Sequence, residues 1–116
     1  MSRAKNWILA SVALFLAGTS GMASAGQVAN AAIVHLTTIQ QDGNLLFINV
    51  NQASTNPPAC STNPGFQFVL ALNTTLGQQT MAMLLAARAS GALVTIVGSG
   101  DCGVFATIET AVNVAY

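Results

Sequence analysis

Three glycines near the C-terminus have the spacing of a nucleotide-binding turn. Gly98, Gly100 and Gly103 form the pattern G-x-G-x-x-G directly after the apolar run LVTIV. A dinucleotide site also needs a following helix, whose N-terminus binds the pyrophosphate, and an acidic residue about 20 positions further on. The 13 residues after Gly103 are too few for these parts. We therefore predict no cofactor. We interpret the glycines as residues that let the backbone turn at the end of a strand.

Few other side chains could perform acid–base chemistry. His35 is the only histidine, and Asp42, Asp101 and Glu109 are the only acidic side chains. A catalytic base needs an orienting carboxylate or a nucleophile within hydrogen-bond reach, and none of these residues lies in a recognisable motif. We predict a structural or surface role for His35, a turn-shaping role for Asp101, and a contact of Glu109 with Arg88 or solvent. The sequence predicts no enzyme.

The first 25 residues have the three parts of a secretory signal peptide. Arg3 and Lys5 precede the apolar run WILASVALFLA, and the small residues ASA at positions 23–25 favour cleavage directly before Gly26. The apolar run is shorter than the roughly 20 residues that span a bilayer. We predict a signal peptide over residues 1–25, a secreted or periplasmic location, and no stable membrane insertion after cleavage. The alternative is an uncleaved membrane anchor.

Cys60 and Cys102 are the only cysteines of the chain. An exported chain enters an oxidising compartment, where two cysteines allow a single pairing. The sequence therefore predicts a Cys60–Cys102 disulfide. No metal site is predicted, because two cysteines and one histidine are not a zinc ligand set. The chain also has no C-x-x-C motif for redox chemistry.

Residues 26–116 are enough for one small domain with a single core. Within them Arg88 is the one basic side chain against three acidic ones, so no basic patch for nucleic acid remains. Charged residues make up 5% of the whole chain, against about a quarter in ordinary globular domains. Uncharged polar surfaces resist association less than charged ones. Two alternatives stay open: a neutral exposed surface, or a surface partly covered by identical subunits.

Periodicity and turn residues predict five strands and one helix in the order β-β-β-α-β-β. Asp42-Gly43 indicates a hairpin between the first two strands. Asn73-Thr74-Thr75 and Gly91 are the expected helix caps. The predicted strands are 27–40, 44–52, 65–72, 93–97 and a last one within 104–116 that is broken near Glu109, and the helix is 76–90. The expected core face of the helix consists of Leu76, Thr80, Met83, Leu84 and Ala87.

This order of elements is that of an OB-fold, a five-stranded Greek-key barrel with its helix between the third and fourth strands. We therefore predict a mainly β protein with one helix, forming a single OB-fold-like domain over residues 26–116. The alternative is an open α+β sheet with one packed helix, because element order does not establish closure of the barrel.

The segments FQFVLAL, GQQTMAMLLAARASG, VTIVGSGDC and TIET, together with a loop cysteine, resemble a group of small secreted bacterial proteins, mostly uncharacterised. The layout is also similar to the pentameric B subunits of subtilase-type and pertussis-like AB toxins, which are disulfide-bonded OB-folds that bind sialylated glycans. This resemblance implies the OB-fold, ring assembly and ligand binding. The second disulfide and the longer segment before the final strands of those toxins are absent. Their sugar-contacting positions find no counterparts here, so no glycan site is carried over.

Two places are candidates for contacts between identical subunits. Gln78, Ala82, Ala86 and Ala89 form a stripe on the helix that would permit close approach, the alternative being an ordinary exposed alanine-rich face. Phe47 points off the core face of the second strand and is a candidate for a subunit contact or for stacking on a sugar. The alternative is that Phe47 closes the other side of the barrel.

The predicted function is a secreted, non-enzymatic binding module that takes a glycan or a protein as ligand and assembles as a homo-oligomer. A competing class is a monomeric periplasmic protein with a structural or inhibitory role. No nucleic-acid partner is predicted.

Overall fold

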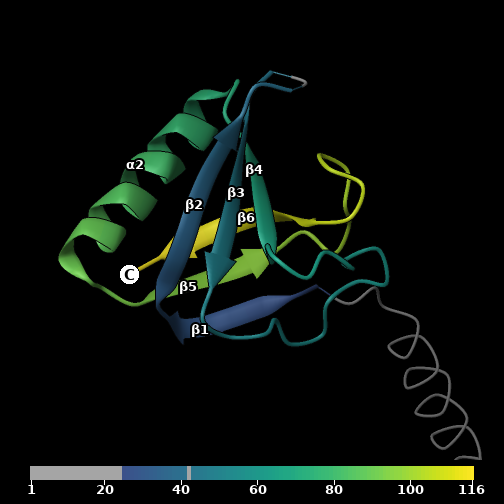
Figure 1. Cartoon of the computed structure of the whole chain (residues 1–116), viewed down its shortest axis with the longest axis horizontal. Coiled ribbons are helices and arrows are strands. Elements are labelled where there is room, and N and C mark those ends of the chain that lie inside the picture. Colours follow the sequence, from purple (N-terminus) through teal and green to yellow (C-terminus); the bar gives the residue numbers. More distant parts are fainter. Residues whose placement is uncertain (1–24, 42) are drawn as a thin grey trace, which may run out of the picture.

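The protein consists of one six-stranded sheet and one helix (Figure 1). The computed structural model describes residues 25–41 and 43–116, so the predicted signal peptide, apart from Ala25, and Asp42 lie outside the described residues. Along the chain the elements are β1 (Gln27–Ala31), β2 (Ile33–Ile39), β3 (Leu45–Val50), β4 (Phe68–Ala71), α2 (Thr75–Ser90), β5 (Val94–Gly98) and β6 (Glu109–Ala115). In space the strands follow the order β1-β5-β6-β4-β3-β2.

The first predicted strand is split in two, so the prediction of one continuous strand over 27–40 is wrong. β1 pairs with β5, whereas β2 pairs with β3, and only Ala32 separates them along the chain. Asn30 has a φ of 51°, a left-handed conformation that Asn tolerates better than β-branched residues do. Asn51 supports the break, because its side-chain oxygen accepts a hydrogen bond from the Ala32 amide at 2.9 Å.

The break at Ala32 curls the sheet. β1 and β2 are the two edge strands, yet they are joined by one residue, so the two edges converge at that corner. Figure 1 shows β2, β3 and β4 running across the direction of β1, β5 and β6. These two halves join through β4 and β6, which are parallel and pair at two positions, Phe68 with Glu109 and Val69 with Thr110.

The mainly β architecture with one helix is confirmed. The predicted five-stranded barrel is not what forms, because the split first strand gives six strands and a curled sheet of half-barrel shape. The open α+β sheet with one packed helix, kept as the alternative, describes this arrangement.

Both faces of the sheet bury apolar side chains. Leu46, Ile48 and Val50 lie on one face, as predicted, in the main core with Leu84 and Ala87 of the helix. A smaller cluster on the opposite face contains Leu45, Phe47, Val69 and Ile108 and is covered by partly buried residues that include Phe66 and Phe105 of the long loops. The loops thus protect a face of the sheet that α2 does not reach.

The helix boundaries are confirmed, but its predicted core face is partly wrong. The Thr74 side chain caps the helix by accepting from the Gly77 amide, and Gly91 ends it with a φ of 71°. The buried residues of the helix are Gly77, Leu84 and Ala87. Leu76 and Met83, predicted to face the core, are 68% and 38% exposed. Gly77 lies directly against the backbone of Ala71, which leaves no room for a Cβ there. No helix in the described part of the chain is long and apolar enough to cross a bilayer.

Replacing Gly77 with alanine is expected to lower the free energy of unfolding by about 1–3 kcal/mol, the usual range for overpacking. In an exposed helix the same change would stabilise by about 1 kcal/mol. Here a Cβ at Gly77 would collide with the backbone oxygen of Ala71, so the sign reverses. Urea denaturation measures the change, with the exposed Gln79→Ala in the same turn as control. An increase in stability for Gly77→Ala would contradict this close approach.

Candidate functional site

The G-x-G-x-x-G segment encloses a side chain of the protein itself. Glu109, the first residue of β6, is fully buried, and the Gly100 amide donates a hydrogen bond to its Oε2 at 2.9 Å. A Cβ at Gly98 would collide with the Glu109 carboxyl group. Gly100 has a φ of 86°, which favours glycine. Gly98 therefore leaves room for the carboxylate of Glu109, and Gly100 donates a hydrogen bond to it.

Glu109 has a second backbone donor far away in the sequence. The amide of Gly26, directly before β1, donates to the same Oε2 at 2.9 Å. Oε1 is buried and has no hydrogen-bond partner among the described residues. The prediction that Glu109 contacts Arg88 or solvent is wrong. Sequence reasoning missed this burial because both hydrogen-bond donors of the carboxylate are backbone amides, and the pattern of side chains in a sequence does not show where such amides lie.

The predicted disulfide is confirmed. Cys60 and Cys102 are bonded, with their Cα atoms 6.2 Å apart. The same two loops are also joined by hydrogen bonds, because the Thr107 carbonyl accepts from the amides of Thr62 and Asn63 at 3.0 and 3.1 Å. The disulfide thus fixes the loops that cover the smaller cluster on the outer face of the sheet.

The predicted interface residues fall in two different environments. Phe47 is nearly buried, and its ring centroid lies 5.3 Å from that of Phe66 and 4.9 Å from that of Phe105. It therefore packs within the chain, as one of the two alternatives expected. The four helix residues are all exposed: Gln78, Ala82, Ala86 and Ala89. Of the four, only Gln78 borders a hollow, and its side chain donates a hydrogen bond to the Leu72 carbonyl.

His35 lies on the exposed side of β2, and its Nδ1 is 3.2 Å from the carbonyl oxygen of its neighbour Val34. Asp101 shapes the turn after β5, because its carboxylate accepts hydrogen bonds from the Ser99 hydroxyl and the Gly103 amide. Among the described residues, no group of three or more His, Cys, Asp or Glu side chains could hold a metal ion.

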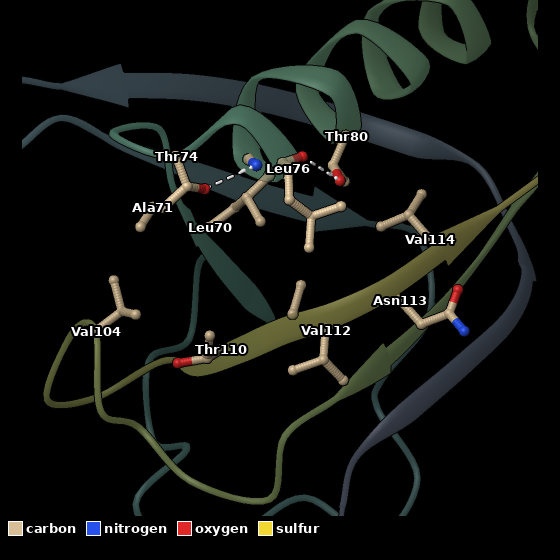
Figure 2. Close-up of a pocket in the computed structure, with 12 residues that line it drawn as sticks. Leu70, Ala71, Thr74, Leu76, Thr80, Val104, Thr110, Val112, Asn113 and Val114 are labelled. Atoms are coloured by element: carbon tan, nitrogen blue, oxygen red, sulfur yellow. Dashed lines mark hydrogen bonds between the residues drawn. The ribbon is translucent and has the colours of Figure 1, made fainter.

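A hollow of about 220 Å³ lies between the first turns of α2 and strand β6 (Figure 2). Leu76 extends from the helix into this space, and Val112 and Val114 line it on β6. Thr74 and Thr80 use their hydroxyls within the helix, at the Gly77 amide and the Leu76 carbonyl. We call this hollow the α2–β6 groove. Its full lining is Leu70, Ala71, Thr74, Leu76, Gly77, Thr80, Val104, Thr110, Ala111, Val112, Asn113 and Val114.

One edge of β6 is open along the groove. β5 pairs with β6 as far as Ala115, but on the other side β4 reaches only Glu109 and Thr110. From Ala111 to Ala115, that edge of β6 has no partner strand within residues 43–116 or 25–41. Val112 is 58% exposed and Leu76 is 68% exposed. An unpaired strand edge thus lies beside exposed apolar side chains.

The groove is apolar and carries no titratable side chain in its lining. A second, wider hollow on the other side of α2 includes Gln78, Leu72 and Met81 and borders the turn before β3. Sequence reasoning could not find the α2–β6 groove, because its existence depends on how early β4 and β6 diverge.

Comparison with protein-family models, with curated proteins and with solved structures gave no match to this chain.

Proposed function

We propose that this protein is an exported, non-enzymatic binding module that takes an extended, apolar segment of a partner protein as an additional strand along β6. The observation that carries the proposal is the open edge of β6 from Ala111 to Ala115, beside the α2–β6 groove. Export is supported by the Cys60–Cys102 disulfide, which is consistent with a periplasmic or extracellular location.

An extended peptide fits both properties of the site. The unpaired amides and carbonyls of a strand edge can pair with the backbone of another chain. Side chains of an added strand alternate between its two faces, so one set would point toward Leu76 and the other toward Val112 on the opposite side of β6 (Figure 2). Both residues are exposed and leave apolar surface to cover. The 220 Å³ of the groove lies below the 300–1,000 Å³ typical of small-molecule pockets, so it suits one or two side chains.

A protein segment is favoured over a glycan by the residues of the groove. Its lining contains no aromatic and no charged side chain that could stack on or bind a sugar. The rings of Phe47, Phe66 and Phe105 pack on one another. The glycan alternative of the predicted ligand therefore gains no support from this groove.

We also infer that the half-barrel is a variant of the OB-type arrangement. If β1 and β2 are counted as one broken first strand, then β3, β4, β5 and β6 become the second, third, fourth and fifth strands. Read from β2 to β1, the sheet then has the strand order 1-2-3-5-4-1. The helix then connects the third and fourth strands, as in an OB-fold. The inference is supported by this order and by the parallel pairing of β4 with β6.

Peptide binding should depend on the β6 edge. Ten-residue peptides selected from a random phage-displayed library are expected to bind the protein with micromolar affinity, measured by fluorescence anisotropy. Val112→Glu should weaken binding by about tenfold or more, equivalent to about 1.4 kcal/mol, because it places a charge on the apolar edge. The matched control is Leu85→Glu, a 51% exposed helix residue outside the groove lining, which should change affinity less than twofold.

Methylation of alternate backbone nitrogens in the best peptide distinguishes strand addition from contacts of side chains alone. Strand addition predicts loss of binding, because the methylated nitrogens no longer donate hydrogen bonds. Binders that tolerate both methylation and Val112→Glu would refute the proposal. If light scattering shows self-association that Val112→Glu abolishes, the added strand comes from a second copy of this chain.

A further inference from the structure

We propose that the buried carboxylate of Glu109 is the docking site for a new amino terminus, formed when the chain is cut between Ala25 and Gly26. Hydrolysis by a processing peptidase adds water across this amide bond, leaving a carboxylate on Ala25 and a protonated amine on Gly26. That ammonium group then forms an ion pair with Glu109. The inference concerns a different part of the molecule from the α2–β6 groove.

Gly26 is already held at both of its backbone groups. Its nitrogen donates to Glu109 Oε2 at 2.9 Å, and its carbonyl accepts from the Gly98 amide at 2.8 Å. Gly26 is buried, whereas Ala25 is exposed. The bond between Ala25 and Gly26 therefore lies where the chain passes from solvent into the protein.

The unpartnered oxygen of Glu109 faces the same residue. A Cβ at Gly26 would collide with Oε1 of Glu109 and with the Ser54 hydroxyl. Glu109 Oε1 and the Ser54 hydroxyl oxygen therefore both lie against the α-carbon of Gly26. A peptide nitrogen offers one N–H, which Oε2 already accepts, and Oε1 remains without a partner. An ammonium group at the same position has three donors, enough to reach both carboxylate oxygens.

The buried carboxylate of Glu109 also lacks a positively charged partner among the described residues. Glu109 is 0% exposed, and its two hydrogen-bond donors among the described residues, Gly26 and Gly100, are neutral amides. A buried carboxylate without a counter-ion is unfavourable. Arg88, the one basic side chain among the described residues, is exposed in the last turn of α2. The ammonium group would place the missing positive charge at hydrogen-bond distance.

The composition of the chain provides a direct test. Lys5 is the only lysine, so cleavage before Gly26 leaves the α-amino group as the one primary amine of the product. The full chain is expressed in a secreting host, and the processed protein is purified and sequenced from its N-terminus. Acylation by an amine-reactive ester is then followed by mass spectrometry, in native buffer and in concentrated urea.

The proposal predicts that sequencing starts at Gly26 and that the native protein is acylated at least about tenfold more slowly than the unfolded one, because an ion-paired, buried amine is a poor nucleophile. Glu109→Gln should raise the native rate about tenfold. Asp101→Asn, which removes an exposed carboxylate of the neighbouring turn, should leave the rate unchanged within about twofold.

A variant with two residues inserted between Ala25 and Gly26 keeps Glu109 but moves the amine away, and it should be acylated in the native state at the unfolded rate. This variant decides the matter even if Glu109→Gln fails to fold. A mature chain that starts elsewhere, equal native and unfolded rates, or a slow rate in the insertion variant would each overturn the proposal.

Discussion

Replacing Gly98 with alanine is expected to lower the free energy of unfolding by about 3–5 kcal/mol, one of the largest effects of any single substitution here. The added Cβ would occupy the position of the Glu109 carboxyl group, so this buried side chain must move. It would then lose the hydrogen bonds from Gly26 and Gly100 that neutralise part of its desolvation. Chemical denaturation of the oxidised protein measures the loss.

The control is another glycine of the same motif. Gly103 is exposed, and a Cβ there would lie 3.4 Å from the Asp101 carboxylate, close to an ordinary contact. Gly103→Ala should therefore change stability by less than about 0.5 kcal/mol, as surface substitutions usually do. The motif is thus expected to be strict at its first glycine and tolerant at its third.

A double-mutant cycle identifies the cause. In a Glu109→Ala background the collision partner is absent, so Gly98→Ala should cost less than about 1 kcal/mol. If the two substitutions were additive, the carboxylate would not be the reason for a glycine at position 98.

Removal of the Cys60–Cys102 disulfide is expected to lower the free energy of unfolding by about 4 kcal/mol, because the bond closes a long loop and restricts the unfolded chain. The two cysteines are 42 residues apart. The effect is measured with the double variant Cys60→Ser/Cys102→Ser, which leaves no unpaired thiol.

Part of the native loop arrangement should survive this change. Thr107 still accepts hydrogen bonds from Thr62 and Asn63, and Phe66 and Phe105 still pack against Phe47. The single variant Phe105→Ala, with the disulfide intact, tests this packing separately and should lower stability by about 3 kcal/mol. A loss of less than about 1 kcal/mol on removing the disulfide would contradict the loop-closure account.

Features with a local signal could be predicted from the sequence. The helix begins after an N-terminal Thr cap and ends at Gly91, and both caps are as expected. Leu46, Ile48 and Val50 share a buried face because a strand alternates its side chains. The disulfide followed from the presence of two cysteines.

Features that depend on distant parts of the chain could not be predicted. Asn30 interrupts a run of strand-forming residues, but in its left-handed conformation it accepts a hydrogen bond from Gln52 and donates one to Thr95, both far along the chain. The sequence predicts a contact of Glu109 with Arg88 or solvent, and acidic residues are indeed rarely buried. It is buried because Gly26 and Gly98, from opposite ends of the domain, leave space for it, while the amides of Gly26 and Gly100 donate hydrogen bonds to it.

The single residue between β1 and β2 also constrains the order of folding. β2 can pair with β3 through a short turn, but β1 must wait for β5, which pairs Gln27 with Val97. Contacts between residues so far apart in the sequence slow folding, because a long loop must close before they form. The N-terminal strand can therefore be placed only after the chain has been made as far as β5, although it is the first strand of the sheet along the chain.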